Sequence, residues 1–65
     1  MSNMDKFLGL VLQYGHDVNV KKYEITFKDA GEKGNQYNFT CNTIKDRVYE
    51  FAKETNFEII NIIEK

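Results

Sequence analysis

The chain has 65 residues, of which 9 are basic and 10 acidic, so its formal net charge is -1, and 42% of its residues are hydrophobic. A chain of this length buries only roughly 60% of the surface that it exposes when unfolded, which leaves little room for a deep cleft. The apolar content excludes a disordered chain, and the near-neutral charge argues against the general attraction to phosphate on which most nucleic-acid binders depend. We therefore expect a single packed domain over residues 1–65 that does not have nucleic acid as its partner.

The cysteine content and the absence of a long apolar segment are typical of a cytoplasmic protein. Cys41 is the sole cysteine, so a disulfide within the chain cannot stabilise the fold. The longest apolar run covers residues 7–12 and includes a glycine, which makes it too short for a membrane span. We expect a cytoplasmic protein without membrane contact.

The first 15 residues predict a helix. Ser2 or Asn3 can cap its start, and Gly15 is placed to end it. At 100° per residue, the apolar side chains cover an arc of roughly 200°, which is wider than packing against one neighbour requires. Apolar residues also alternate in the second half of this segment, so a strand over residues 4–14 stays open as an alternative.

Two alternating segments follow and predict a β-hairpin. The first covers residues 18–27, and its apolar phase changes near Lys21, which predicts a β-bulge there. Residues 29–35 are rich in turn formers and separate the two segments, as expected for a hairpin loop. The inward-facing residues of the hairpin are predicted to be Tyr23, Ile25 and Phe27 on the first strand and Tyr37, Phe39 and Cys41 on the second.

Residues 44–55 predict a second helix, because Thr43 is a good N-cap and the apolar residues recur on one side. Asn56 can adopt the left-handed conformation that ends a helix. Residues 58–64 hold four isoleucines around Asn61, and this composition predicts a strand with two apolar faces. Simple alternation places Ile60 and Ile62 on the inward face and Ile59 and Ile63 on the outward face.

The element order α-β-β-α-β predicts a small α+β domain. A right-handed crossover through the second helix places the last strand parallel to the second strand. If the last strand lies beside the first, the three-stranded sheet has the order 2-1-3 and the helix of residues 44–55 packs on one face. Either the N-terminal helix or a second copy of the protein would cover Ile59 and Ile63 on the other face.

Residues suited to catalysis or metal binding are sparse. His16, beside Asp17, is interpreted as a loop residue or as a cation at a helix end. Cys41 falls on the inward side of a strand, where a free cysteine behaves as a small hydrophobic residue. One histidine and one cysteine do not supply a metal-ligand set. We therefore expect a protein that is not an enzyme and that uses neither a cofactor nor a metal.

The surplus apolar surface is the positive signal. The leucines of the first helix and the isoleucines of the last strand either meet within the monomer or form a two-fold homodimer interface, which we favour. Tyrosines near the edges of the two helical stripes suit a protein interface. The open edge of the second strand also offers a template for strand addition by a partner. The candidate partner-binding residues are Leu8, Leu12, Tyr14, Tyr49, Ile59 and Ile63.

These observations favour a small non-catalytic protein-interaction module. The composition, rich in Asn, Ile and Lys, resembles that of small cytoplasmic proteins of low-GC bacteria and their phages. Our leading hypothesis is therefore a phage- or mobile-element-encoded inhibitor or regulator that binds a host protein. One alternative is a nucleotide- or nucleic-acid-binding protein with a dimer cleft that contains Lys21, Lys22 and Lys28. Another is a structural subunit of a larger assembly, because such a subunit also needs only a complementary surface.

Overall fold

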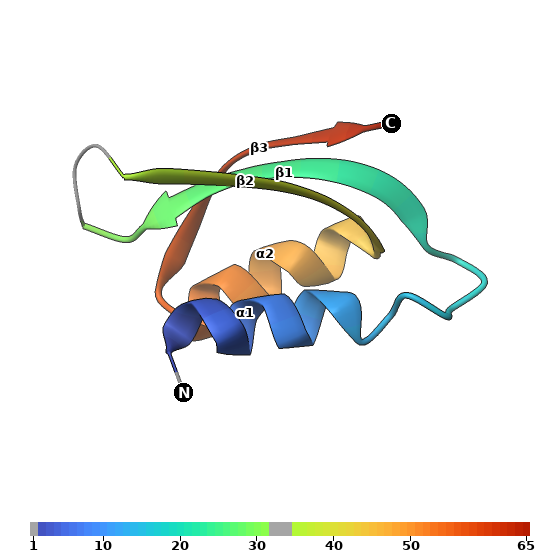
Figure 1. Ribbon diagram of the computed structural model, residues 1–65, viewed down its shortest axis with the longest axis horizontal. Coiled ribbons are helices and arrows are strands. Elements are labelled where there is room, and N and C mark those ends of the chain that lie inside the picture. Colours follow the sequence, from blue (N-terminus) through green and yellow to red (C-terminus); the bar gives the residue numbers. More distant parts are fainter. Residues whose placement is uncertain (1, 32–34) are drawn as a thin grey trace.

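The computed structural model describes residues 2–31 and 35–65. The turn of the predicted hairpin, residues 32–34, lies outside the described residues. Both helices lie on one face of a three-stranded sheet with the order β2-β1-β3 (Figure 1), so the predicted α+β fold is confirmed. The elements are α1 (Asn3–Leu12), β1 (Lys21–Asp29), β2 (Gln36–Thr43), α2 (Lys45–Glu54) and β3 (Phe57–Glu64).

The central strand β1 is antiparallel to both of its neighbours. Strands β2 and β3 therefore run in the same direction, as the predicted crossover through α2 requires. The pairing of β1 with β2 brings the predicted inward residues of the hairpin opposite one another, and all six lie in the core or pack against it, which confirms their predicted face. These pairs are Tyr23 with Cys41, Ile25 with Phe39, and Phe27 with Tyr37.

Residues 3–12 form a helix, so the alternative of a strand over residues 4–14 is wrong. The Ser2 hydroxyl oxygen accepts a hydrogen bond from the backbone N–H of Asp5 at 3.2 Å, which satisfies one of the donors that a helix start leaves unpaired. Phe7 and Val11 are four residues apart, and both are fully buried. This helical spacing of the core residues outweighs the short alternating pattern.

The predicted cap of the second helix is wrong by one residue. The helix begins at Lys45 with Ile44 as its N-cap, although an isoleucine side chain cannot accept a hydrogen bond. Thr43, the predicted cap, is the last residue of β2 and is fully buried. Its hydroxyl donates to the backbone carbonyl of Val11 at 2.9 Å, because its side chain points into the core and away from the start of α2.

Asn56 ends α2 in the left-handed conformation, with a φ of 64°, as predicted. A residue with a Cβ atom is strained there by roughly 1–2 kcal/mol, and asparagine tolerates the conformation better than most residues. We expect Asn56→Ala to lower the free energy of unfolding by about 1 kcal/mol and Asn56→Gly to leave it equal or higher. Urea titration of both variants checks this prediction, and equal stability of the two would contradict it.

The β-bulge lies in β3 and not near Lys21. Residues 18–20 precede β1, so the predicted extension of that strand is wrong. Thr26 pairs with Asn61 and Phe27 pairs with Ile59, which leaves Ile60 without a partner on β1. A bulge of this kind shifts the alternation of side chains by one position.

The shift corrects the predicted faces of β3. Ile59 packs against the core instead of facing outward, and Ile60 is 44% exposed instead of facing inward. Ile62 packs against the core as predicted, and Ile63 is 44% exposed on the other face as predicted. Simple alternation therefore assigns the correct faces to Ile62 and Ile63, which follow the bulge, but not to Ile59 and Ile60.

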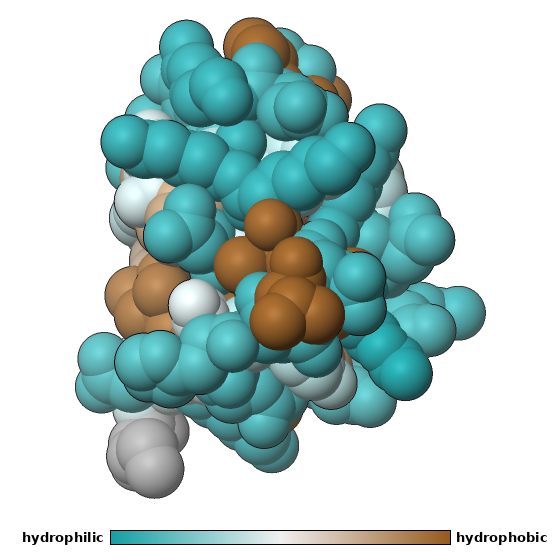
Figure 2. Space-filling model, turned by 90° about the vertical axis from the view of Figure 1, so that its right-hand side faces the viewer, coloured by the Kyte–Doolittle hydropathy of each residue, from teal (hydrophilic) through white to brown (hydrophobic). Residues whose placement is uncertain are grey.

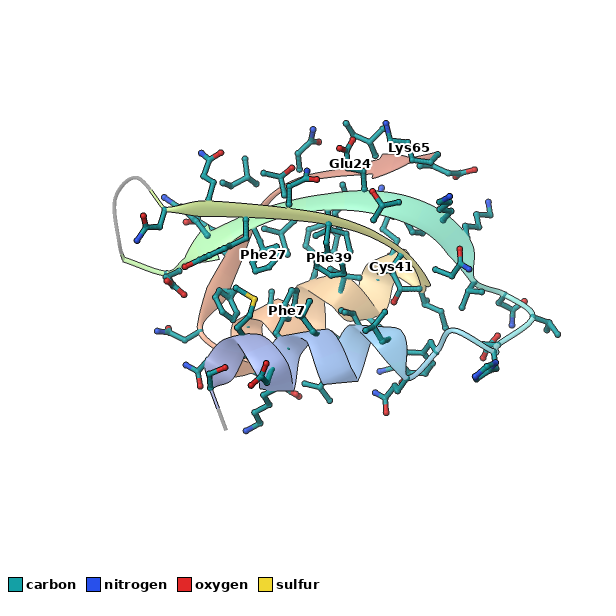
Figure 3. All side chains as sticks on the ribbon, in the orientation of Figure 1. Phe7, Glu24, Phe27, Phe39, Cys41 and Lys65 are labelled. Atoms are coloured by element: carbon teal, nitrogen blue, oxygen red, sulfur yellow. The ribbon has the colours of Figure 1, made fainter. Side chains whose placement is uncertain are left out.

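The core is an aromatic cluster between the sheet and the helices. In Figure 3, Phe27, Phe39 and Cys41 point from the sheet toward the helices, and Phe7 points from α1 toward the sheet. The ring centroids of Phe7 and Phe27 are 4.8 Å apart, and Phe57 lies 5.4 Å from Phe7 and 5.2 Å from Phe27. Tilted and edge-on rings at these distances attract one another beyond the burial of their surface.

The outer face of the sheet is mostly polar. Asn38 donates to the hydroxyl of Thr26 at 2.8 Å, and Glu24 forms an ion pair with Lys65 at 3.1 Å, which Figure 3 shows on the side away from the helices. Helix α1 lies with α2 on the opposite face (Figure 1). Of the two alternatives for covering Ile63, the one in which α1 covers it is therefore wrong within the part of the chain that the structure describes.

Candidate functional site

The two edges of the sheet differ in their chemistry. Among the eight described residues of β2, Gln36–Thr43, none is charged, glycine or proline. Strand β3 has a charged residue at each end, Glu58 and Glu64, and contains the bulge at Ile60. Charges and bulges are the devices by which sheets discourage pairing with another chain. The edge of β3 is therefore protected, whereas the edge of β2 offers unpaired backbone groups on a regular strand.

Apolar side chains border the free edge of β2. On the central strand, the inward residues Ile25 and Phe27 are at most 1% exposed. On β2, the inward residues Tyr37, Phe39 and Cys41 are only half-buried. This difference arises because β1 has a neighbour on both sides and β2 on one side only. The apolar row of β2 consequently continues to the surface at its open side.

Helix α1 adds two leucines on the same side of the molecule. It packs against α2 and β2, and Figure 1 shows it beneath β2. The Tyr14 ring just after α1 stacks on Phe51 of α2, with centroids 5.9 Å apart. Leu8 and Leu12 directly follow the fully buried Phe7 and Val11, so at 100° per residue they project about 100° away from the core-facing side of α1. Leu8 packs partly against the core, and Leu12 is 51% exposed.

We call this region the β2-side surface: the open backbone edge of β2 (Gln36–Thr43) together with Leu8 and Leu12 of α1. It combines hydrogen-bonding groups with an apolar border and has no charged residue in its strand. Two of the predicted partner-binding residues thus lie beside the edge that the sequence had suggested for strand addition.

The other predicted partner-binding residues lie elsewhere. The ring of Tyr14 stacks on Phe51 within the domain, and Tyr49 is 48% exposed on α2. Ile59 packs toward the core, whereas Ile63 lies on the outer face, where its backbone pairs with Glu24. The sheet separates Ile63 from the leucines of α1, so the four aliphatic residues neither meet in the monomer nor form one patch.

Exposed apolar residues form separate areas. Figure 2, which faces the end where the loop between α1 and β1 lies, shows small apolar areas surrounded by hydrophilic residues. In that loop Val18 is 95% exposed, and Ile60 is exposed at the bulge of β3. Sequence analysis missed both residues, because each lies in an alternating apolar run and only the position of the strand start or of the bulge shows that it is exposed.

The catalytic candidate His16 lies on the surface, in a turn. His16 is exposed in the loop after α1, and the carboxylate of its neighbour Asp17 accepts the backbone N–H of Asn19 at 2.7 Å. Residues 2–31 and 35–65 contain no group of three potential metal ligands and enclose no detectable pocket. Neither helix in this part of the chain has the length and apolar character needed to cross a membrane.

Cys41 is half-buried on the inward face of β2, and this burial raises the pKa of its thiol above the ordinary value. Because the folded state holds the proton more tightly, any contribution of Cys41 to stability is lost as the pH rises through the thiol range. We expect iodoacetamide to alkylate Cys41 more slowly in the folded protein than in urea between pH 7 and 9, because thiolate is the reactive form. Equal rates in both states would contradict this expectation.

The lysines proposed for a nucleotide cleft are largely paired with carboxylates. Lys28 lies 3.3 Å from Glu58, and Lys21 lies 3.8 Å from Glu64, whereas Lys22 is exposed. On α2, Arg47 donates to Glu50 at 2.8 Å, and this contact holds the pKa of Arg47 above its ordinary value. The described surface therefore mixes charges of both signs around these lysines.

Comparison with protein-family models, with curated proteins and with solved structures finds no match to this chain. A functional interpretation therefore depends on the β2-side surface itself.

Proposed function

We propose that this chain is a small non-catalytic protein-interaction domain that binds a partner chain at its β2-side surface. The observation that supports the proposal is the uncharged, regular edge of β2 beside the exposed side chain of Leu12. Natural proteins usually protect such an edge with charges, proline or a bulge, and an unprotected edge binds another strand readily. Strand addition gives affinity through main-chain hydrogen bonds and specificity through alternate side chains.

The difference between the two edges of the sheet supports specific binding at β2 over non-specific association. The edge of β3 has Glu58, Glu64 and the bulge at Ile60, so a strand that approaches there meets charges and an irregular backbone. The outer face is mostly polar, and ion pairs join Lys28 to Glu58 and Lys65 to Glu24. The partner is a protein in this proposal; a host protein bound by a phage-encoded inhibitor and a neighbouring subunit of an assembly both stay predictions.

Affinity capture with matched variants tests the proposal. Wild-type protein and the variants Leu12→Lys and Ile63→Lys are immobilised and exposed to an extract of the source cells. Leu12 and Ile63 are aliphatic and similarly exposed, at 51% and 44%, but only Leu12 belongs to the β2-side surface. We expect that the wild-type protein and Ile63→Lys both capture the same partner protein from the extract and that Leu12→Lys does not.

The same purified partner should then bind saturably in isothermal titration. A turnover that depends on His16 or Cys41 would contradict the non-catalytic assignment. Retention of partners by all three proteins alike would contradict the proposed surface.

A further inference from the structure

We infer that the β2 edge binds an extended segment of its partner that has apolar side chains at every second position. This inference rests on the proposed function and specifies what the partner must present. Three features of the domain carry it: the backbone of β2, the side chains on the two sides of its edge, and the position of α1.

The backbone of β2 sets the conformation of the ligand. Every second residue of an edge strand points its N–H and C=O groups away from the sheet, and an added strand pairs with them at roughly 4.8 Å. Strand β2 pairs with β1 in unbroken register from Lys21 with Thr43 to Lys28 with Gln36. A regular strand on one side keeps the free groups on the other side evenly placed, which favours a ligand without a bulge.

The two faces of the edge set the side-chain pattern. Inward residues of an added strand would lie beside the half-buried row of Phe39 and Cys41 and above Leu8 and Leu12 of α1. Outward residues would extend the exposed polar row of Asn38, Thr40 and Asn42. The ligand should therefore alternate apolar and polar residues, because adjacent side chains of a strand face opposite sides. The uncharged β2 makes no demand for a charged ligand.

The position of α1 argues against a second copy of the domain as the occupant. Two packed helices need about 8–10 Å between their axes, whereas neighbouring strands are about 4.8 Å apart. Helix α1 contacts β2 and α2 contacts β3, so each edge strand of the sheet has a helix beneath it. Pairing of β2 with its own copy would bring the two α1 helices to about one strand spacing, which is closer than helices pack. A single extended segment has no helix beneath it and avoids this clash.

The first test uses a peptide whose sequence is that of β1, residues 21–29. In the folded domain this segment pairs with the other side of β2, and it alternates Tyr23, Ile25 and Phe27 with polar residues. Fluorescence anisotropy of the labelled peptide is measured against the intact protein, and a control peptide has the same residues reordered to remove the alternation. We expect saturable binding of the β1 peptide below about 1 mM and binding of the control that is weaker by about tenfold or more.

Variants of the protein locate the bound peptide. Leu12→Lys should weaken binding by about tenfold or more, because it places a charge under the added strand, whereas Ile63→Lys should change it by less than about twofold. In amide hydrogen exchange, alternate residues of β2 should become protected on peptide binding, and β3 should not change. Circular dichroism of both variants confirms that they fold.

Several results would overturn the inference. These are an absence of saturable binding, equal binding of the reordered peptide, insensitivity to Leu12→Lys, and protection of β3 in place of β2. Sedimentation equilibrium of the free protein should show a monomer; a dimer that Leu12→Lys dissociates would identify a second copy as the occupant. That outcome, or Leu12-dependent capture of a folded partner without peptide binding, would leave the proposed function standing. Loss of both capture and peptide binding would remove the proposed function as well.

Discussion

Replacing Phe7 with alanine should leave the domain largely unfolded at room temperature. Phe7 is fully buried at the centre of the aromatic cluster, where its ring contacts those of Phe27 and Phe57. Truncation of a buried phenylalanine costs about 3–5 kcal/mol, from lost burial and from the cavity that remains. A domain of this size rarely has more than about 3–5 kcal/mol of total stability, so a single such change removes most or all of it.

Far-ultraviolet circular dichroism during urea titration measures this effect. The matched control is Tyr49→Ala, which also truncates an aromatic residue of a helix but at a position that is 48% exposed. The control should unfold cooperatively with a free energy of unfolding within about 1 kcal/mol of wild type. If Phe7→Ala retained a cooperative transition with a similarly small loss, the placement of Phe7 in the core would be wrong.

Replacing Thr43 with valine should lower the free energy of unfolding by about 1–3 kcal/mol, although the two side chains have nearly the same shape. The Thr43 hydroxyl is fully buried and donates to the carbonyl of Val11 at 2.9 Å. Val11 lies in the last turn of α1, where backbone carbonyls lack a partner within the helix. Valine would leave this carbonyl buried without its hydrogen bond and would release the end of α1 from the end of β2.

The control for this change is Thr40→Val, on the exposed outer face of the same strand. Its free energy of unfolding should stay within about 0.5 kcal/mol of wild type, because no buried group loses a partner. Amide exchange adds a local readout: residues in the last turn of α1 should exchange faster in Thr43→Val than in Thr40→Val. Equal urea midpoints for the two variants would show that the hydrogen bond contributes nothing.

The topology was predictable because it depends on long-range rules that the sequence exposes. The hairpin shows clear alternation on both strands, and the right-handed crossover leaves few positions for the last strand. The inward set from Tyr23 to Cys41 follows from the alternation, and the order 2-1-3 follows once the last strand is placed beside the first. The strand alternative for α1 was wrong because four alternating residues carry less information than the burial of Phe7 and Val11 on one side of a helix.

Local features in β3 and before α2 were not predictable in the same way. The run of isoleucines fits a regular strand and a strand with a bulge equally well. Only the register with β1 shows the bulge at Ile60 and the resulting faces of Ile59 and Ile60. Thr43 suits a helix cap by residue type, but the approach of Val11 gives its hydroxyl a different partner. The β2-side surface depends on both helices lying on one face, which neither helix specifies by itself.

Strand β1 lies between β2 and β3, and the segments of chain that connect it to these two strands differ greatly in length. In sequence, 6 residues separate Asp29 from Gln36, whereas 27 separate Asp29 from Phe57. Loop-closure entropy grows with the logarithm of length, so pairing with β3 costs about 1.3 kcal/mol more than pairing with β2. Formation of the hairpin therefore loses less chain entropy than pairing of β3 with β1. The burial of Phe57, Ile59 and Ile62 offsets the larger entropy loss of β3.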